Sequence, residues 1–550
     1  MKAVFAIALQ TARSAFRSKV FFVILMLTFL ATALLPSSVV GDATLAGEFR
    51  IKINYSIGII TFLTGLAALW VGTINISREI EAYQIHMVLT KPISGLKLWM
   101  GKFLGVAVLC SGILFISSTY IYYIITSEIE EIRTDLVDKS TRLLIEMEET
   151  LTIEQKKQLI GGEVSYLLSM TQTYATDEEK EKFKTLKGVE SPDKISIESR
   201  LKPLAKSFQE FDELNNEILT GRSYYRWTKP DYQKLAIEYL QASKRLRPGM
   251  PEDMQQQMLA EETRAQESRY GSLPVMRQGQ PIPKVFKFDN LPKLKEGQSL
   301  FLRFRVFAGD SLDQKPRNTA IAVQFVFTDK DGQKKTVMRP YPFYIRTTKF
   351  YTERLPASVL AGQSSIELLV FNMDHMGRRT GKPSIKELVI QAQDGPSILL
   401  GQTEFSSNYW RCIALIALFV AFLVIVGTTS GVCFSTPVAV MISASYIIVG
   451  VGVSSVLSTD SQYQVVKYEG QLEDEAIGSD LVKSFHKVLR TCLVSVDTFS
   501  RMEFLSSGKA ITWELVLKVL LYDFILKGLP LLLIGLYALQ RREFGLVVRK

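Results

Sequence analysis

Six long apolar runs are the feature of this chain that most constrains its fold. Each run is about 20 residues long, which is enough for a helix to cross the hydrocarbon core of a bilayer. The mean hydropathy of the 550-residue chain is nevertheless only +0.13, so the apolar runs must be combined with a substantial polar domain. We therefore expect an α-helical membrane protein with six spans, near residues 20–40, 55–75, 103–125, 409–428, 436–457 and 516–539.

Basic residues next to the spans predict the orientation. Twelve of them, against three acidic residues, lie in three segments, so these segments carry +9 of the formal net charge of +10. The positive-inside rule places all three segments in the cytoplasm, which predicts a multi-pass membrane protein with both termini inside. Nucleic acid is not an expected partner, because the basic residues flank spans. The twelve are Lys2, Arg13, Arg17, Lys19, Arg78, Lys91, Lys97, Lys102, Arg541, Arg542, Arg549 and Lys550.

A large insert, residues 126–408, separates the third and fourth spans and is expected outside the cell membrane. Residues 126–282 are rich in Glu, Lys, Gln and Leu and predict a helical stalk, with Asp231 directly after Pro230 as a helix start. Residues 283–400 alternate in short stretches between turn residues, which predicts an antiparallel β-sandwich. This pattern resembles jelly-roll, carbohydrate-binding-like sandwiches in fold only, so a glycan or a periplasmic protein stays open as its partner.

The two parts of the chain on either side of the insert carry the predicted spans. Residues 1–125 carry the first three spans, and residues 401–550 carry the last three with a small outer segment at 458–514. Residues 1–19 alternate small, apolar and basic positions, which fits either a helix lying on membrane lipid at the inner interface or a plain basic flank.

The loop between the second and third spans, residues 77–102, carries the strongest functional signal. It is charged, amphipathic and longer than a simple turn requires. A short helix anchored to spans on both sides can receive force from a soluble partner, whereas the alternative is an interfacial loop without a partner. The residues expected at this coupling site are Arg78, Glu79, Glu81, Tyr83, Gln84, Lys91 and Pro92.

Three stretches of this sequence resemble the permease subunits of ABC-2 type transporters. They are Arg78-Glu79-Ile80-Glu81 with Leu89-Thr90-Lys91-Pro92-Ile93-Ser94, then Gly101-Lys102-Phe103-Leu104-Gly105, and the closing segment from Gly508 to Trp513 with Arg541-Arg542-Glu543-Phe544. The resemblance also extends to the copper-maturation and sodium-export branches of that family. It implies that two permease copies work with two separate ATPase subunits in export, and that residues 77–102 form the coupling helix. The insert at 126–408 departs from the family pattern.

No sequence motif for nucleotide hydrolysis is present. The stretch from Gly95 to Gly101-Lys102-Phe103 has five residues between its glycines and places Phe where a P-loop needs a hydroxyl. The chain is therefore not expected to be an enzyme or to hold a cofactor or metal. In the last span, Asp523 and Lys527 are spaced four apart, which permits either a structural ion pair or a role in a translocation path.

Three functions stay open at this point. The first is a permease subunit of an ABC exporter, and the second is an ABC-linked machine that performs mechanical work on the envelope. The third is a membrane-anchored sugar-binding or sensing protein without an ATPase.

Overall fold

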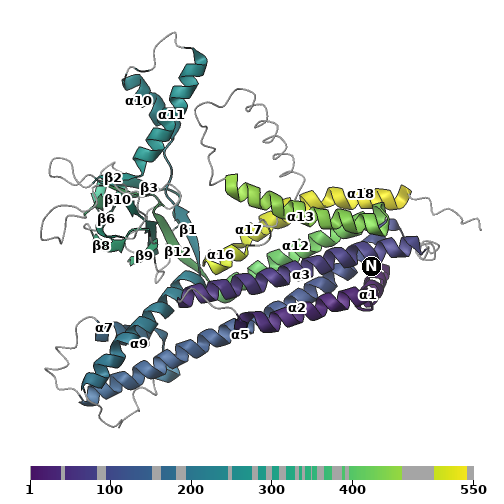
Figure 1. The fold of residues 1–550 in the computed structure, drawn as a ribbon, viewed down its shortest axis with the longest axis horizontal. Helices are drawn as coiled ribbons and strands as arrows, with labels where there is room; N and C mark the ends of the chain where they lie inside the picture. Colours follow the sequence, from purple (N-terminus) through teal and green to yellow (C-terminus); the bar gives the residue numbers. More distant parts are fainter. Residues whose placement is uncertain are drawn as a thin grey trace, which may run out of the picture. The chain divides into compact units, whose positions relative to one another are not determined.

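The computed structural model gives the chain as two compact units, Met1–Gly221 with Thr403–Lys550, and Arg222–Gln402. Its first unit consists of helices, and its second combines antiparallel strands with two helices (Figure 1). The structure describes residues 2–38, 44–82, 94–150, 163–180, 194–243, 245, 251–274, 283–292, 300–308, 317–328, 334–336, 341–348, 350–355, 364–373, 387–390, 395–460, 499 and 501–541.

Apolar helices form the first unit, as expected of a membrane protein. Among the described residues, four helical stretches are long and apolar enough to cross a membrane: α3 (Leu45–Glu81), α5 (Gly95–Thr150), α12 (Phe405–Cys433) and the run Trp513–Arg541. That run comprises α17 (Trp513–Lys518), η3 (Val519–Leu526) and α18 (Lys527–Arg541).

The described residues thus contain four such helices, or five if one bent pair of helices counts as a single span, where the sequence predicts six spans. The expected first span is α2 (Lys19–Ser38), which meets α1 (Lys2–Phe16) at a bend of 77° and counts as a candidate only together with it. The expected fifth span corresponds to α13 (Thr436–Asp460), whose stretch Thr436–Tyr446 is apolar but shorter than a span.

Glycines bring two pairs of these helices into close contact. A Cβ at Gly431 of α12 would lie 2.5 Å from the carbonyl oxygen of Thr73 in α3, and one at Gly427 would lie 2.9 Å from that of Leu69. In α5, a Cβ at Gly101 or Gly105 would collide with α1 at 2.7 and 2.5 Å. Both pairs have glycines four positions apart, the spacing by which membrane helices pack backbone against backbone.

The helix α5 continues far beyond the length that a bilayer requires. Its 56 residues span about 84 Å at 1.5 Å per residue, against about 30 Å of hydrocarbon. The second half of α5 packs with α7 (Glu163–Tyr174) and α9 (Lys194–Leu214), which is followed by the π-helix η1 (Asn215–Leu219). Buried side chains of these helices belong to the same apolar cluster as α3 and α12, so the stalk and the apolar helices of the first unit share one core.

An arginine of α5 fixes this stalk. Arg133 forms ion pairs with Glu130 at 2.6 Å and Glu179 at 3.0 Å, and it donates to the carbonyl oxygen of Tyr174 at 2.7 Å. The hydrogen bond from Arg133 lowers the pKa of the Glu179 carboxyl to about 2. Glu179 therefore remains ionised and holds the segment after α7 against α5.

The second unit contains two larger sheets and a small one. The strand orders are β1-β12-β4-β9, then β3-β10-β6-β7 with β8 also on β6, and β2-β11-β5. The strands are β1 (Thr220–Arg226), β2 (Ser272–Pro274), β3 (Lys284–Phe288), β4 (Leu300–Arg305), β5 (Phe307–Ala308), β6 (Asn318–Thr328), β7 (Lys334–Thr336), β8 (Tyr341–Arg346), β9 (Phe350–Leu355), β10 (Ile366–Asn372), β11 (Glu387–Val389) and β12 (Ser397–Glu404).

Alternating side chains of the two larger sheets build one core. In β10 every second residue is buried, and Leu368 lies opposite Phe286 on one side and Phe325 on the other. Leu302 of β4 and Ile398 of β12 belong to the same buried cluster, so the two sheets pack face to face as an antiparallel sandwich.

The second unit begins earlier in the sequence than expected, because the sequence predicts that residues 126–282 are helical throughout. Strand β1 lies inside that region and pairs with β12. The helices α10 (Tyr232–Ala242) and α11 (Glu252–Tyr270) also belong to the sandwich unit. The predicted helix start is confirmed, because the Asp231 side chain accepts a hydrogen bond from the backbone N–H of Lys234 and caps α10.

Candidate functional site at the ends of α3 and α5

The loop that the sequence singles out is flanked by the C-terminus of α3 and the N-terminus of α5. Helix α3 continues to Glu81, so the predicted site residues Arg78, Glu79 and Glu81 lie on its last turns. Helix α5 begins at Gly95 and contains Lys102. The other predicted site residues lie outside the described residues; they are Tyr83, Gln84, Lys91 and Pro92.

A buried ion pair joins these two helix ends. Lys102 is only 5% exposed, and its ammonium group contacts the carboxylate of Glu79 and donates to the side-chain oxygen of Asn75 at 3.3 Å. Asn75 and Glu79 lie one turn apart on α3, so the single ammonium group of α5 has two acceptors on α3. A buried charge is tolerated only when it is paired in this way, which makes the contact specific for one register of α3 against α5.

Glu81 is engaged within the chain as well. Its carboxylate accepts a hydrogen bond from the backbone N–H of Thr436 at 2.8 Å, at the N-terminus of α13, where a negative charge is favourable. The hydroxyl of Ser77 contacts that of Thr436. Glu79 and Glu81, which the sequence places at the expected coupling site, therefore hold α3 to α5 and α13.

Arg78 differs from these two glutamates. Its side chain is exposed, and it lines a hollow of about 400 Å³ at the end of α3. Arg17 lines the same hollow. Among the three described residues of the predicted site, Arg78 and Glu81 are both exposed, but Glu81 is held by its hydrogen bond from Thr436.

A second ion-paired lysine joins the first turns of α3 to the middle of α5. Lys52 of α3 contacts Glu128 of α5 at 2.5 Å and Glu48 at 2.8 Å, and its side chain is buried. Neither this contact nor the role of Asn75 is predicted from the sequence. One feature of the sequence points to both contacts. Lys52 and Glu79 are 27 positions apart, and Lys102 and Glu128 are 26 apart, so two helices running in opposite directions can place each lysine opposite a glutamate.

The two pairs bracket an apolar layer. Residues 53–77 and 103–127 contain no Asp, Glu, Lys or Arg. At 1.5 Å per residue the pairs are about 40 Å apart along the helices, close to the thickness of a bilayer with its headgroup regions. The charges therefore lie where a membrane would place them, at its two interfaces.

In the last apolar stretch, Asp523 and Lys527 form an ion pair at 2.9 Å and are both half-buried. Asp523 belongs to η3, a π-helical segment of eight residues. Wider turns of this kind interrupt α-helices frequently at functional sites, and no local signal in the sequence predicts this one.

No model of a known protein family matches this sequence, and no curated protein is significantly similar to it. Among the described residues there is also no cluster of three or more His, Cys, Asp or Glu that could hold a metal ion.

Proposed function

We propose that this chain is the membrane-embedded permease subunit of a bacterial ABC-2 type transporter. In this proposal it has six spans, both termini are cytoplasmic and residues 126–408 are extracytoplasmic. Two copies work with two separate ATPase subunits, which dock at residues 77–102 and drive export of a substrate. The observation that carries the proposal is the buried contact of Lys102 with Glu79 and Asn75 at the base of this loop.

The contact supports coupling for a mechanical reason. A soluble ATPase can move a membrane subunit only through an element that does not deform on its own. The two helices that enter and leave the loop are joined by a desolvated charge pair within one or two turns of their ends. Force applied to the loop would therefore move α3 and α5 together.

The placement of charges supports the proposed topology. The basic residues near the loop and at the two chain ends favour the cytoplasmic side for all three segments. The ion pairs of Lys102 and Lys52 then mark the inner and outer interfaces, and the second half of α5 projects outward.

A second candidate function, mechanical work on the cell envelope, is favoured by the continuity of α5. One helix runs from the loop through the apolar layer into the stalk with α7 and α9, and all these parts share one core. Motion produced at the loop could thus reach the outer part directly. In this case ATP hydrolysis would move the outer domain and no cargo would cross the membrane.

Affinity purification in mild detergent tests the common premise of both candidates. We expect an ABC ATPase to co-purify with the wild-type chain and to be lost from Arg78→Glu and from Tyr83→Ala/Gln84→Ala. Asp135→Asn, at an exposed position of α5, is the matched control and should retain the ATPase. Glu79 and Glu81 are left unchanged, because both hold the fold. If no ATPase accompanies the wild type, both candidates are wrong.

Hydrogen exchange on the purified complex separates the two candidates. Mechanical work predicts that ATP changes the exchange of amides in α7 and α9. Export through the membrane helices with a static stalk predicts changes confined to the apolar helices and the loop.

A further inference from the structure

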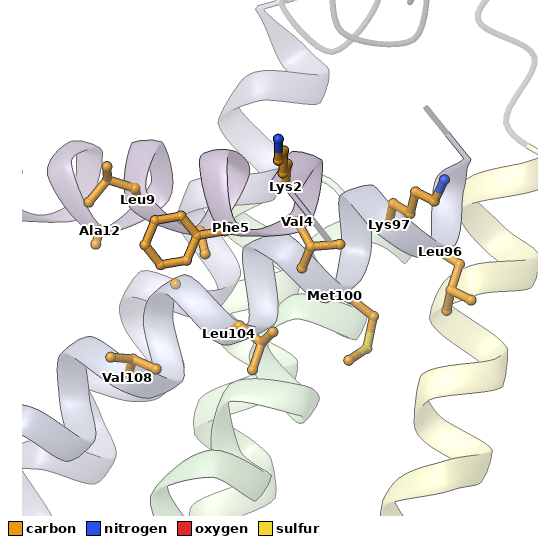
Figure 2. A pocket seen from close by; sticks show the side chains of 12 residues that line it. Lys2, Val4, Phe5, Leu9, Ala12, Leu96, Lys97, Met100, Leu104 and Val108 are labelled. Atoms are coloured by element: carbon orange, nitrogen blue, oxygen red, sulfur yellow. The ribbon is translucent and has the colours of Figure 1, made fainter. Parts of the chain in front are cut away.

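Helices α1 and α5 enclose an apolar groove that the coupling proposal does not use. The groove has a volume of about 880 Å³, within the range of sites that bind small molecules. Figure 2 shows its walls, with α1 crossing the first turns of α5. The close approach at Gly101 and Gly105 fixes the two helices against each other and so forms the floor of the groove.

The side chains along the groove are apolar and face outward. Phe5 of α1 is 72% exposed and Val108 of α5 is 68% exposed, and Leu9 and Leu104 are exposed between them. Single exposed apolar residues are common on proteins. Apolar residues that line one contiguous groove instead mark a binding surface. In a membrane chain this surface suits a hydrocarbon chain.

Two lysines give the groove a polar edge. Figure 2 shows Lys2 and Lys97 on the same edge, with Val4, Met100 and Leu104 lying further in. Both lysines are exposed, and no acidic residue is found among the described residues that line the groove. The arrangement therefore combines a hydrocarbon-binding surface with two positive charges at one end.

We propose that this groove binds an anionic phospholipid. Its acyl chain lies along Phe5, Leu104 and Val108, and its phosphate contacts the ammonium groups of Lys2 and Lys97. The charges favour a lipid over a second copy of this chain, because an apolar helix face would leave both ammonium groups without an anion. A bound lipid would bridge α1 and the first turns of α5, next to the loop at 77–102. The inference needs the chain to lie in a membrane and does not depend on an ATPase.

Native mass spectrometry of the purified chain with added phosphatidylglycerol or phosphatidylcholine tests the proposal. We expect the wild type to retain one phosphatidylglycerol more tightly than phosphatidylcholine. Each lysine should contribute about 5-fold to this preference, as basic side chains near an anionic surface do. Lys2→Gln/Lys97→Gln should therefore lose the preference. Arg13→Gln/Lys19→Gln removes the same charge from exposed positions outside the groove and should keep it.

A second variant keeps the lysines and fills the groove. Ala12→Trp places a large ring among the lining residues, and we expect it to weaken retention of phosphatidylglycerol while the thermal stability in phosphatidylcholine stays that of the wild type. Equal retention of the two lipids by the wild type, or an equal loss in the Arg13/Lys19 control, would overturn the proposal. It would also be overturned by efficient disulfide cross-linking of Leu9→Cys between two copies in native membranes, because the groove would then be covered by protein.

Discussion

The buried contact of Lys102 makes a quantitative prediction about Glu79→Gln. This change removes the charge opposite an ammonium group that is 5% exposed, and it leaves Asn75 as the remaining acceptor at 3.3 Å. Breaking a buried ion pair by removal of one partner costs about 3–5 kcal/mol. Because Asn75 remains, we expect about 3 kcal/mol of lost unfolding free energy for Glu79→Gln.

Removing the other partner of the ion pair, Lys102, should cost less unfolding free energy. In Lys102→Met the carboxylate of Glu79 loses its partner, but its side chain is 21% exposed and can be partly hydrated, so we expect about 1–2 kcal/mol. The double variant leaves no buried charge and should lie within about 1 kcal/mol of the wild type. The two single effects should therefore not add, which is the signature of a direct interaction.

Unfolding in mixed micelles with increasing sodium dodecyl sulfate measures all four chains of this cycle. The control is Asp135→Asn, which breaks an exposed pair with Lys139 at 2.7 Å in the same helix and should cost less than about 1 kcal/mol. The reasoning is refuted if Glu79→Gln costs no more than this control. It is also refuted if the two single effects add in the double variant.

Three further predictions concern packing, pH and a buried hydroxyl. Gly431→Ala should cost about 1–3 kcal/mol of unfolding free energy, since its Cβ meets a backbone oxygen of α3 at 2.5 Å, whereas Gly112→Ala, with nothing within 4 Å, should not destabilise. The folded pKa of Glu179 is lowered to about 2, so its stabilisation is complete above its unfolded pKa of about 4.3 and is lost as pH falls toward 2. The melting temperatures of wild type and Glu179→Gln should accordingly differ at pH 6, still differ at pH 4 and converge only as pH falls to 2; a constant difference would contradict the assignment. Tyr409→Phe removes a buried hydrogen bond of 2.7 Å to a backbone oxygen of α5 and should cost about 1 kcal/mol in the same micelle titration, and no loss would show that the hydroxyl is satisfied otherwise.

The sequence predicts local elements of this fold better than contacts between them. Apolar runs locate α3, α5 and α12 because each run is long enough to be recognised alone. Asp231 predicts the start of α10 because a cap acts within one turn. Strand β1 was missed, since its partner β12 lies far away in sequence and its own signal is a few residues with two tyrosines.

The candidate site shows the same limit. The charges at the ends of the second and third apolar runs look like polar loop residues when they are read one by one. Lys52 and Glu128 are 76 positions apart, and no pattern within either helix reveals that they pair. The sequence places Glu79 at the expected coupling site, but it does not show that Lys102, counted there among the basic residues that flank the spans, is its partner within the chain.

The two ion pairs between α3 and α5 also restrict how this protein can change shape. Packed helices can slide past one another by small shear displacements, but sliding here would break the contacts of Lys52 and Lys102 at both ends simultaneously. Rotation of α3 and α5 as one rigid body breaks neither contact. Spin labels placed on these two helices should therefore keep one separation in any conformational change of the protein.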